Sequence, residues 1–447
     1  MDGNMKKWIV SILAVIFVMM ALAPAAFAES APPSNAKKGD FTSVDPATHT
    51  AVFQPVDSDQ PITLKLADSI KAEDVQLNDR VLVSMSDVNG EQVASEISTM
   101  FIGLTLDKLI ALLLVGLVGG LLSGFIGSGG AFVLTPSMMA LGAPGAVAVA
   151  SNMCHKFPKA MVGTYKRFKY GQVDVKLGLV MGVSSIVGVE LGIRVQEKIL
   201  DTWGSTGSDL YVSFVFVIIL VVVGAIILRD ALTGSKTVNA DVMPKLALAM
   251  QKIKIPPMMN FKKAGVVLSA WVTVPIGFAT GLLAATIAVG GFIGVPGMIY
   301  VVGASAMVAS ATELLIAFVM GMWGSVEWAL AGLIDIRMTL LILATSLIGV
   351  QLGALGTTYV KDHTIKLVMA SVMLIVAVSR GVKVPVYLSK LGAIDINTGT
   401  ADILNALSFW TLIAALAAAG FIIASAMIKG IARAKVEEKE AAIAEGA

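Results

Sequence analysis

Two long stretches of the chain carry no charged side chain. Leu109 to Cys154 and Ala264 to Thr312 contain no Asp, Glu, Lys or Arg. Each stretch is more than twice the ~20 residues that a helix needs to cross the hydrocarbon core of a bilayer. Irregular backbone cannot face lipid, because its N–H and C=O groups would have no hydrogen-bond partners there. Each stretch is therefore predicted to cross the membrane, turn inside it at its glycines and return.

Composition also favours a membrane protein with many spans. Of the 447 residues, 56% are hydrophobic and 14% are charged, and the mean hydropathy is +0.83. These values exclude a water-soluble fold and indicate a mainly α-helical, polytopic membrane protein. Further spans are predicted at about 177–195, 210–228, 338–360, 364–379 and 403–428.

Charge and cysteine content reduce the number of function classes that the chain can belong to. The 33 Lys and Arg nearly balance 31 Asp and Glu, and the net charge of +2 gives no indication of a nucleic acid partner. The one cysteine, Cys154, and three scattered histidines form neither a disulfide framework nor a metal-ligand spacing. We expect no cofactor and no metal. The expected partners are a small anionic substrate and the lipid bilayer, with a homodimer left open.

The first hundred residues differ from the rest. A basic start, an apolar run and the Ala26-Phe27-Ala28 triplet have the layout of a secretory signal peptide, residues 1–28; the alternative is an uncleaved anchor helix. Residues 30–100 are polar, with alternating apolar positions between turns. This pattern predicts about five short strands that close a small β-barrel-like domain. Both interpretations of the N-terminus place that domain outside the cytoplasm.

Part of the sequence recurs 161 residues later. Gly129-Gly130-Ala131-Phe132 returns as Gly290-Gly291-Phe292-Ile293, and segment 186–192 returns as 347–353. Two further pairings, of Ser151 with Ser310 and of Gly171-Gln172-Val173-Asp174 with Gly324-Ser325-Val326-Glu327, break the offset and need gaps. The chain is therefore interpreted as two related halves.

Charge placement predicts how these halves are oriented. Basic residues concentrate after the span 143–165, in the connector 231–263 and in the tail, which places these segments in the cytoplasm. Five crossings per half is an odd number, so the fold class is two inverted five-helix repeats with broken helices. We expect the inner membrane of a bacterium. The predicted organisation is a signal peptide (1–28), an extracytoplasmic β domain (30–100), a first repeat (105–230), a cytoplasmic connector (231–263), a second repeat (264–385) and an additional C-terminal membrane helix with a cytoplasmic tail (403–447).

Glycines interrupt the two uncharged stretches at matching places. Gly129 and Gly130, and Gly290 and Gly291, are predicted to start half-helices inside the membrane. Free N–H groups at helix starts carry partial positive charge and can donate hydrogen bonds to an anion. The alternative is close packing of helices at small residues. Recurrence before a proline in both halves favours the half-helices.

The predicted helix 143–165 carries ionisable residues at mid-membrane. His155 lies ~18 Å from the outer end of this helix, near the middle of a ~30 Å hydrocarbon core. Ionisable groups at that depth normally face a polar cavity. Lys156 could supply the fixed positive charge of an anion path, with His155 as a hydrogen-bond donor or proton carrier. The alternative is a lysine that snorkels to the interface, which suits Lys159 better than Lys156.

Two glutamates are candidates for proton coupling. Glu313 lies at a similar depth in the second half, either as an ion-pair partner of Lys156 or as a proton acceptor, and these roles are compatible. Glu190 has Arg194 one helical turn further on, which favours a local ion pair.

Hydroxyl and amide side chains complete the candidate site. Ser151, Asn152, Ser310 and Thr312 could hydrogen-bond a substrate oxygen, although Ser and Thr inside membrane helices more often bond their own backbone.

These motifs resemble the sulfite exporter TauE/SafE family over about residues 105–385. Halves of that family open with a glycine-rich break, a proline soon after, and a later small-residue segment containing Ser. The resemblance implies a sulfur oxyanion or organosulfonate as substrate. The matching residues are Gly127, Gly129, Gly130, Pro136, Ser151 and Asp174 in the first half, and Gly290, Gly291, Pro296 and Ser310 in the second.

The leading hypothesis is a secondary transporter that exports a small anion of this kind, with proton coupling. The second hypothesis is a membrane-anchored sensor or scaffold that acts through the 30–100 domain. An enzyme is not expected, because the sequence contains no Ser-His-Asp set, metal-ligand cluster or phosphate loop.

Overall fold

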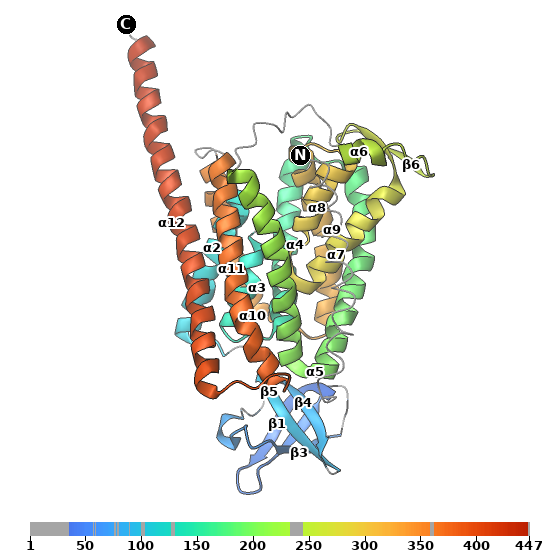
Figure 1. Ribbon diagram of the computed structural model, residues 1–447, viewed down its shortest axis with the longest axis vertical. Helices are drawn as coiled ribbons and strands as arrows, with labels where there is room; N and C mark the ends of the chain where they lie inside the picture. Colours follow the sequence, from blue (N-terminus) through green and yellow to red (C-terminus); the bar gives the residue numbers. More distant parts are fainter. Residues whose placement is uncertain are drawn as a thin grey trace.

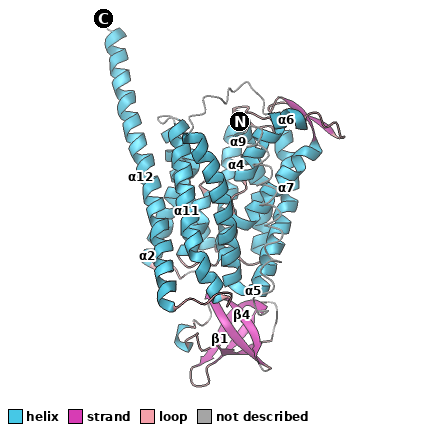
Figure 2. Ribbon diagram, viewed as in Figure 1, coloured by secondary structure: helices cyan, strands magenta, loops and turns pink. Residues whose placement is uncertain are grey.

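The computed structural model describes residues 35–445 apart from 57, 59, 76, 78–79, 89, 100–102, 127–129, 233–244 and 358–361. The predicted signal peptide and Gly129 lie outside the described residues. The chain has two parts, a small sheet domain at one end and a long helical bundle (Figures 1 and 2).

Five strands of the small domain form a closed barrel in the order β1-β2-β3-β5-β4. Phe41 and Phe53 face each other across β1 and β2 with ring centroids 5.4 Å apart, and Leu64 packs in the same core. Alternate residues of β2 are buried, as expected for a strand with one face toward a core. The elements are β1 (Asn35–Asp45), β2 (Thr50–Pro55), β3 (Ile62–Leu66), the 3₁₀ turn η1 (Ala72–Asp74), β4 (Arg80–Val88) and β5 (Glu91–Thr99).

Most of the remaining described chain is helical. Among the described residues, seven helices, with α5 counted as one, are long and apolar enough to cross a membrane, which confirms the predicted polytopic membrane protein. The elements are α2 (Leu106–Ile126), α3 (Ala131–Ala140), α4 (Gly145–Lys169), α5 (Val175–Leu232), α6 (Lys245–Met250), β6 (Met258–Phe261), β7 (Val266–Ser269), α7 (Ala270–Ile287), α8 (Gly291–Gly297), the π-helical turn η2 (Met298–Val302), α9 (Ala306–Leu330), α10 (Ile336–Thr357), α11 (Asp362–Lys390) and α12 (Thr398–Glu445).

Two short apolar helical segments lie among the long helices. They are α3 and the continuous segment made of α8 and η2. Each is followed by a glycine with positive φ, Gly142 at 100° and Gly303 at 94°, a conformation that glycine adopts without the penalty of a Cβ. The long helices α4 and α9 begin three residues after these glycines.

Helix α5 reverses direction beside the barrel (Figure 1). Gly204 interrupts it with φ 65° and ψ −164°, so α5 is two helices joined at a sharp bend. A side chain at position 204 would collide with Ser84 of β4. The bend therefore needs glycine both for its conformation and for its contact with the barrel.

Contacts between the long helices recur with an offset of 161 residues. Gly120 of α2 lies against the backbone of Ser346 in α10, and Gly281 of α7 lies against the backbone of Ser185 in α5. Adding 161 to the number of Gly120 gives Gly281, and subtracting 161 from the number of Ser346 gives Ser185. The two contacts therefore join corresponding positions. Small residues thus let both helix pairs approach closely.

The same offset corrects two pairings made from the sequence. Helices α4 and α9 each have 25 residues and begin 161 apart, so at this offset Ser151 corresponds to Thr312 rather than to Ser310. Gly171 and Gly332, both at φ 66°, lie in the turns that follow α4 and α9. The pairing of Gly171 with Gly324 is wrong, because Gly324 lies inside α9.

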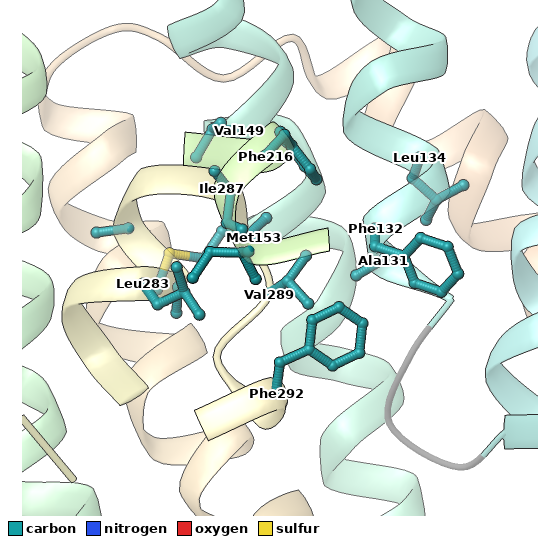
Figure 3. Packing of buried hydrophobic residues seen from close by; sticks show 14 of the residues in the cluster. Ala131, Phe132, Leu134, Val149, Met153, Phe216, Leu283, Ile287, Val289 and Phe292 are labelled. Carbon is teal, nitrogen blue, oxygen red and sulfur yellow. The ribbon is translucent and has the colours of Figure 1, made fainter. Parts of the chain in front are cut away.

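Apolar side chains from both halves fill the centre of the bundle. Phe132 of α3 and Phe292 of α8 lie with ring centroids 5.7 Å apart (Figure 3). Met153 of α4 and Leu283 of α7 belong to the same buried cluster. The two short helices therefore meet in the interior, where the candidate site lies.

Candidate functional site

Helix α4 presents four polar side chains on one side. Asn152, His155, Lys156 and Lys159 follow one another at the spacing of a helix face. Asn152 and His155 are fully buried, and Lys156 is 7% exposed. Because α4 packs against α9, α3 and α10, this polar face lies inside the bundle.

His155 is held on both sides. Its Nδ1 lies 3.3 Å from Asn152 Oδ1, and its Nε2 lies 2.8 Å from Ser346 Oγ on α10. Asn152 Nδ2 donates to the carbonyl of Ala131 and to Thr135 Oγ1, which leaves its oxygen to accept a hydrogen bond from the ring N–H of His155. The Ser346 hydroxyl has one proton, which it can donate either to the ring or to the carbonyl of Leu343 at 3.1 Å, and its oxygen can accept from a ring N–H.

Lys159 reaches the first glycine break. Its ammonium donates a 3.0 Å hydrogen bond to Ser123 Oγ on α2, and Ser123 in turn lies against Gly130. The interpretation of Lys159 as a snorkelling residue is therefore wrong. A hydroxyl inside the protein provides a partner for the ammonium, so it does not need to extend to the interface.

The ammonium of Lys156 forms no hydrogen bond, and no ion pair within 4.0 Å, with any residue in the described ranges. Lys156 and Glu313 of α9 do interact electrostatically. The ion pair with Lys156, one of the two roles considered for Glu313, is therefore not formed within 4.0 Å in the described chain. One buried positive charge has no close counter-ion among the side chains that the structure describes.

Glu313 lies at the second glycine break. Its side chain is buried, and neither carboxylate oxygen has a hydrogen-bond partner among the described residues. It lies directly against Gly294 of α8, where a Cβ would collide with it. Counting 161 residues back from Glu313 gives Asn152, whose amide NH2 donates to two groups of α3 and whose oxygen lies against His155. At this offset, Asn152 has hydrogen-bond partners for its amide, whereas the corresponding Glu313 has none for its carboxylate among the described residues.

Ser151 and Thr312 hold the ends of other helices. Ser151 Oγ accepts a 3.0 Å hydrogen bond from the backbone N–H of Asp335, and Thr312 Oγ1 accepts one of 3.0 Å from the N–H of Asp174. Both hydroxyls are therefore engaged in the scaffold. For Ser310, which is half-buried, the described chain offers no hydrogen bond.

The predicted glycines serve close packing as well as helix initiation. Gly130 immediately precedes α3, and a Cβ on it would collide with the carbonyl of Gly119 in α2. Gly290 immediately precedes α8, and a Cβ on it would lie 2.7 Å from the carbonyl of Thr280. Gly291, the first residue of α8, is buried. Gly130 and Gly290 therefore both precede a short helix and allow close packing, so the two interpretations of these glycines are compatible.

Glu190 takes no part in this cluster. Arg194 Nη2 lies 2.7 Å from Glu190 Oε1 in an i,i+4 pair on α5, and the side chains are 71% and 33% exposed. The favoured interpretation of a local ion pair is confirmed, so Glu190 has a sufficient structural role outside the site.

Sequence reasoning missed three residues of the site, namely Ser123, Lys159 as a buried donor, and Ser346. Lys159 could have been found, because it lies seven residues after Asn152 and so on the same helix face. Ser346 had a weaker signal, the recurrence of Ser185 after 161 residues. Nothing in the sequence indicated that Ser123 lies beside Lys159.

Comparison with known proteins agrees with this architecture. The family model described as "Sulfite exporter TauE/SafE" matches residues 112–380, more than half of the chain. A relative from Bacillus subtilis (strain 168), "Probable membrane transporter protein YunE", is 24% identical over 277 residues, which cover 60% of this chain and 95% of the relative. No solved structure matches the chain. The protein belongs to the sulfite exporter TauE/SafE family and is a polytopic membrane transporter by that membership.

Proposed function

We propose that this transporter carries a small anion, with sulfite or a related sulfur oxyanion or organosulfonate as the substrate class, and that it exports the anion with proton coupling. The observation that carries the proposal is Lys156, a buried residue whose ammonium has no carboxylate within 4.0 Å among the described side chains. A buried charge without a counter-ion is costly, and an anion at this place would remove that cost. The family name supports the sulfur chemistry.

The path is proposed to run where the two short helices meet, between two halves related by a twofold axis in the membrane plane. The recurring contacts with an offset of 161 residues support this relationship. Phe157 and Phe318 are 161 residues apart and stack on each other, with ring centroids 6.1 Å apart, as a residue and its counterpart do when both lie on such an axis. Inverted repeats of this type place the substrate site at their interface near the bilayer midplane.

The barrel end is proposed to face away from the cytoplasm of a bacterial inner membrane. The hairpin β6–β7 lies at the opposite end of the bundle (Figure 1). That hairpin contains Lys262 and Lys263 between its strands, and basic connectors favour the cytoplasmic side.

Flux measurements with purified protein in liposomes test the function. Radiolabelled sulfite, sulfate and sulfoacetate are offered with and without a pH gradient. We expect saturable flux of at least one of these anions, and we expect Lys156→Ala to abolish it. Lys166→Ala is the matched control, because Lys166 lies on the same helix but is exposed. Full flux in Lys156→Ala would remove Lys156 from the mechanism, and absence of anion flux in the wild type would refute the proposal.

A second candidate function is a sensor that acts through the barrel. Glu96 of β5 accepts hydrogen bonds from Ser205 at 3.0 Å and Thr206 at 2.6 Å, which adjoin the bend of α5. Lys38 of β1 donates to the carbonyl of Ala331 after α9. The barrel therefore contacts both halves of the bundle. Removal of residues 30–100 separates the functions, because a carrier would still transport and a barrel-led sensor would not respond.

A further inference from the structure

The charged groups of the site leave one positive charge uncompensated. Lys156 and Lys159 both belong to the polar face of α4, and among the described residues Glu313 is the carboxylate that interacts electrostatically with Lys156. With both lysines charged, Glu313 ionised and His155 neutral, the site carries a single positive charge. In a medium of low polarity this charge decides which anions the site can accept.

Glu313, like Lys156, has no hydrogen-bond partner for its charged group among the described residues. Both of its oxygens are buried without donors in the described chain, so burial disfavours the ionised carboxylate, and a positive charge on Lys156 favours it. An anion that settles beside Lys156 opposes the effect of that charge. The charge of the bound anion and the protonation of Glu313 are therefore linked.

Resting on the proposed function, we infer that the site binds a monoanion with Glu313 ionised and a dianion only when Glu313 takes up one proton. A monoanion alone balances the single positive charge. A dianion leaves one negative charge in excess, which one proton from water removes by converting the Glu313 carboxylate to a carboxylic acid. Divalent oxyanions are thus the proton-coupled substrates, whereas monovalent sulfonates bind without a proton.

The other titratable groups around Glu313 are already engaged. His155 uses both ring nitrogens, and Lys159 donates to Ser123. Asp174, whose N–H bonds the neighbouring Thr312, accepts hydrogen bonds from the backbone N–H groups of Leu177, Lys263 and Ala264. The short helix α8 contributes no titratable side chain. Glu313 is therefore the acceptor that the geometry favours.

Proton uptake during anion binding tests the inference. Full-length protein in detergent is placed in weakly buffered solution with a pH-indicator dye, and either sulfate or methanesulfonate is added. These two probes keep their charges of two and one throughout the neutral pH range. We expect about one proton taken up per bound sulfate and none per bound methanesulfonate, with sulfate affinity falling about tenfold per pH unit above the pKa of the coupled group. Glu313→Gln should bind sulfate without proton uptake and with a flat pH dependence.

Three results would overturn the inference. The first is sulfate binding to the wild type without proton uptake. The second is unchanged uptake in Glu313→Gln, which would assign the proton to another group such as His155. The third is binding of neither anion, which would overturn the inference alone, because sulfite flux in liposomes decides separately whether the proposed function stands. The pH dependence of the wild type decides the question if Glu313→Gln does not fold.

Discussion

The backbone N–H of Asp335 donates a 3.0 Å hydrogen bond to the hydroxyl of Ser151, 184 residues earlier in the chain. The same arrangement joins Asp174 to Thr312. Each half therefore supplies, from α4 or α9, the hydroxyl that holds the start of a helix in the other half. These two bonds connect the helix pair that carries the site to the helices that surround it.

Loss of either hydroxyl should destabilise the protein. Ser151→Ala and Thr312→Val each leave a buried backbone N–H without its acceptor, which costs about 1–3 kcal/mol in the free energy of unfolding. Unfolding in detergent micelles measures this change. Ser310→Ala is the matched control and should change stability by less than about 0.5 kcal/mol. Equal effects of all three substitutions would contradict the register in which Thr312 is the counterpart of Ser151.

Added volume at the helix contacts should be poorly tolerated. Gly120→Ala and Gly281→Ala each place a Cβ against a carbonyl of the neighbouring helix, and overpacking of this kind costs about 1–3 kcal/mol. Thermal unfolding of the two variants should show similar losses, because the contacts correspond. Gly420→Ala in α12 meets no atom within 4 Å and should be neutral or slightly stabilising. A destabilised Gly420→Ala with normal Gly120→Ala would refute this packing.

Glu190 should be dispensable for transport. Its pair with Arg194 is largely exposed, and an i,i+4 pair of this kind contributes about 0.3–0.5 kcal/mol. Glu190→Gln should therefore retain anion flux and its response to a pH gradient in liposomes. Loss of the pH response alone would make Glu190 a coupling residue.

Contact between the barrel and the bundle should depend on Glu96. Glu96→Ala removes the acceptor of two hydroxyls beside Gly204, so backbone amides around the bend of α5 should exchange with deuterium faster. Hydrogen exchange followed by mass spectrometry locates the change. Glu91→Ala provides the control, because Glu91 forms an exposed pair with Lys65 within the barrel. Unchanged exchange at the bend in Glu96→Ala would show that other contacts hold the barrel.

The sequence was sufficient for features that repeat along the chain. The two uncharged stretches predicted membrane helices interrupted at Gly130 and Gly290, because hydrophobic length and glycine position are local properties. It was insufficient for contacts between distant helices. Identical letters favoured Ser310 over Thr312 as the partner of Ser151, although both side chains offer a hydroxyl and only the helix register distinguishes them. Lys159 was misassigned because its partner, Ser123, lies 36 residues away on another helix.

The two counterpart aspartates differ at their remaining oxygens. Asp174 Oδ2 accepts hydrogen bonds from Lys263 and Ala264 beside the hairpin, whereas Asp335 Oδ2 is buried and has no partner in the described chain. At the hairpin end, Asp174 Oδ2 thus accepts two hydrogen bonds that have no equivalent at Asp335 Oδ2 among the described residues. A conformational change that gave each end of the bundle the present shape of the other end would break the two hydrogen bonds to Asp174 Oδ2. It would not form equivalent bonds to Asp335 Oδ2. The molecule therefore cannot be energetically symmetric, even where its helices repeat.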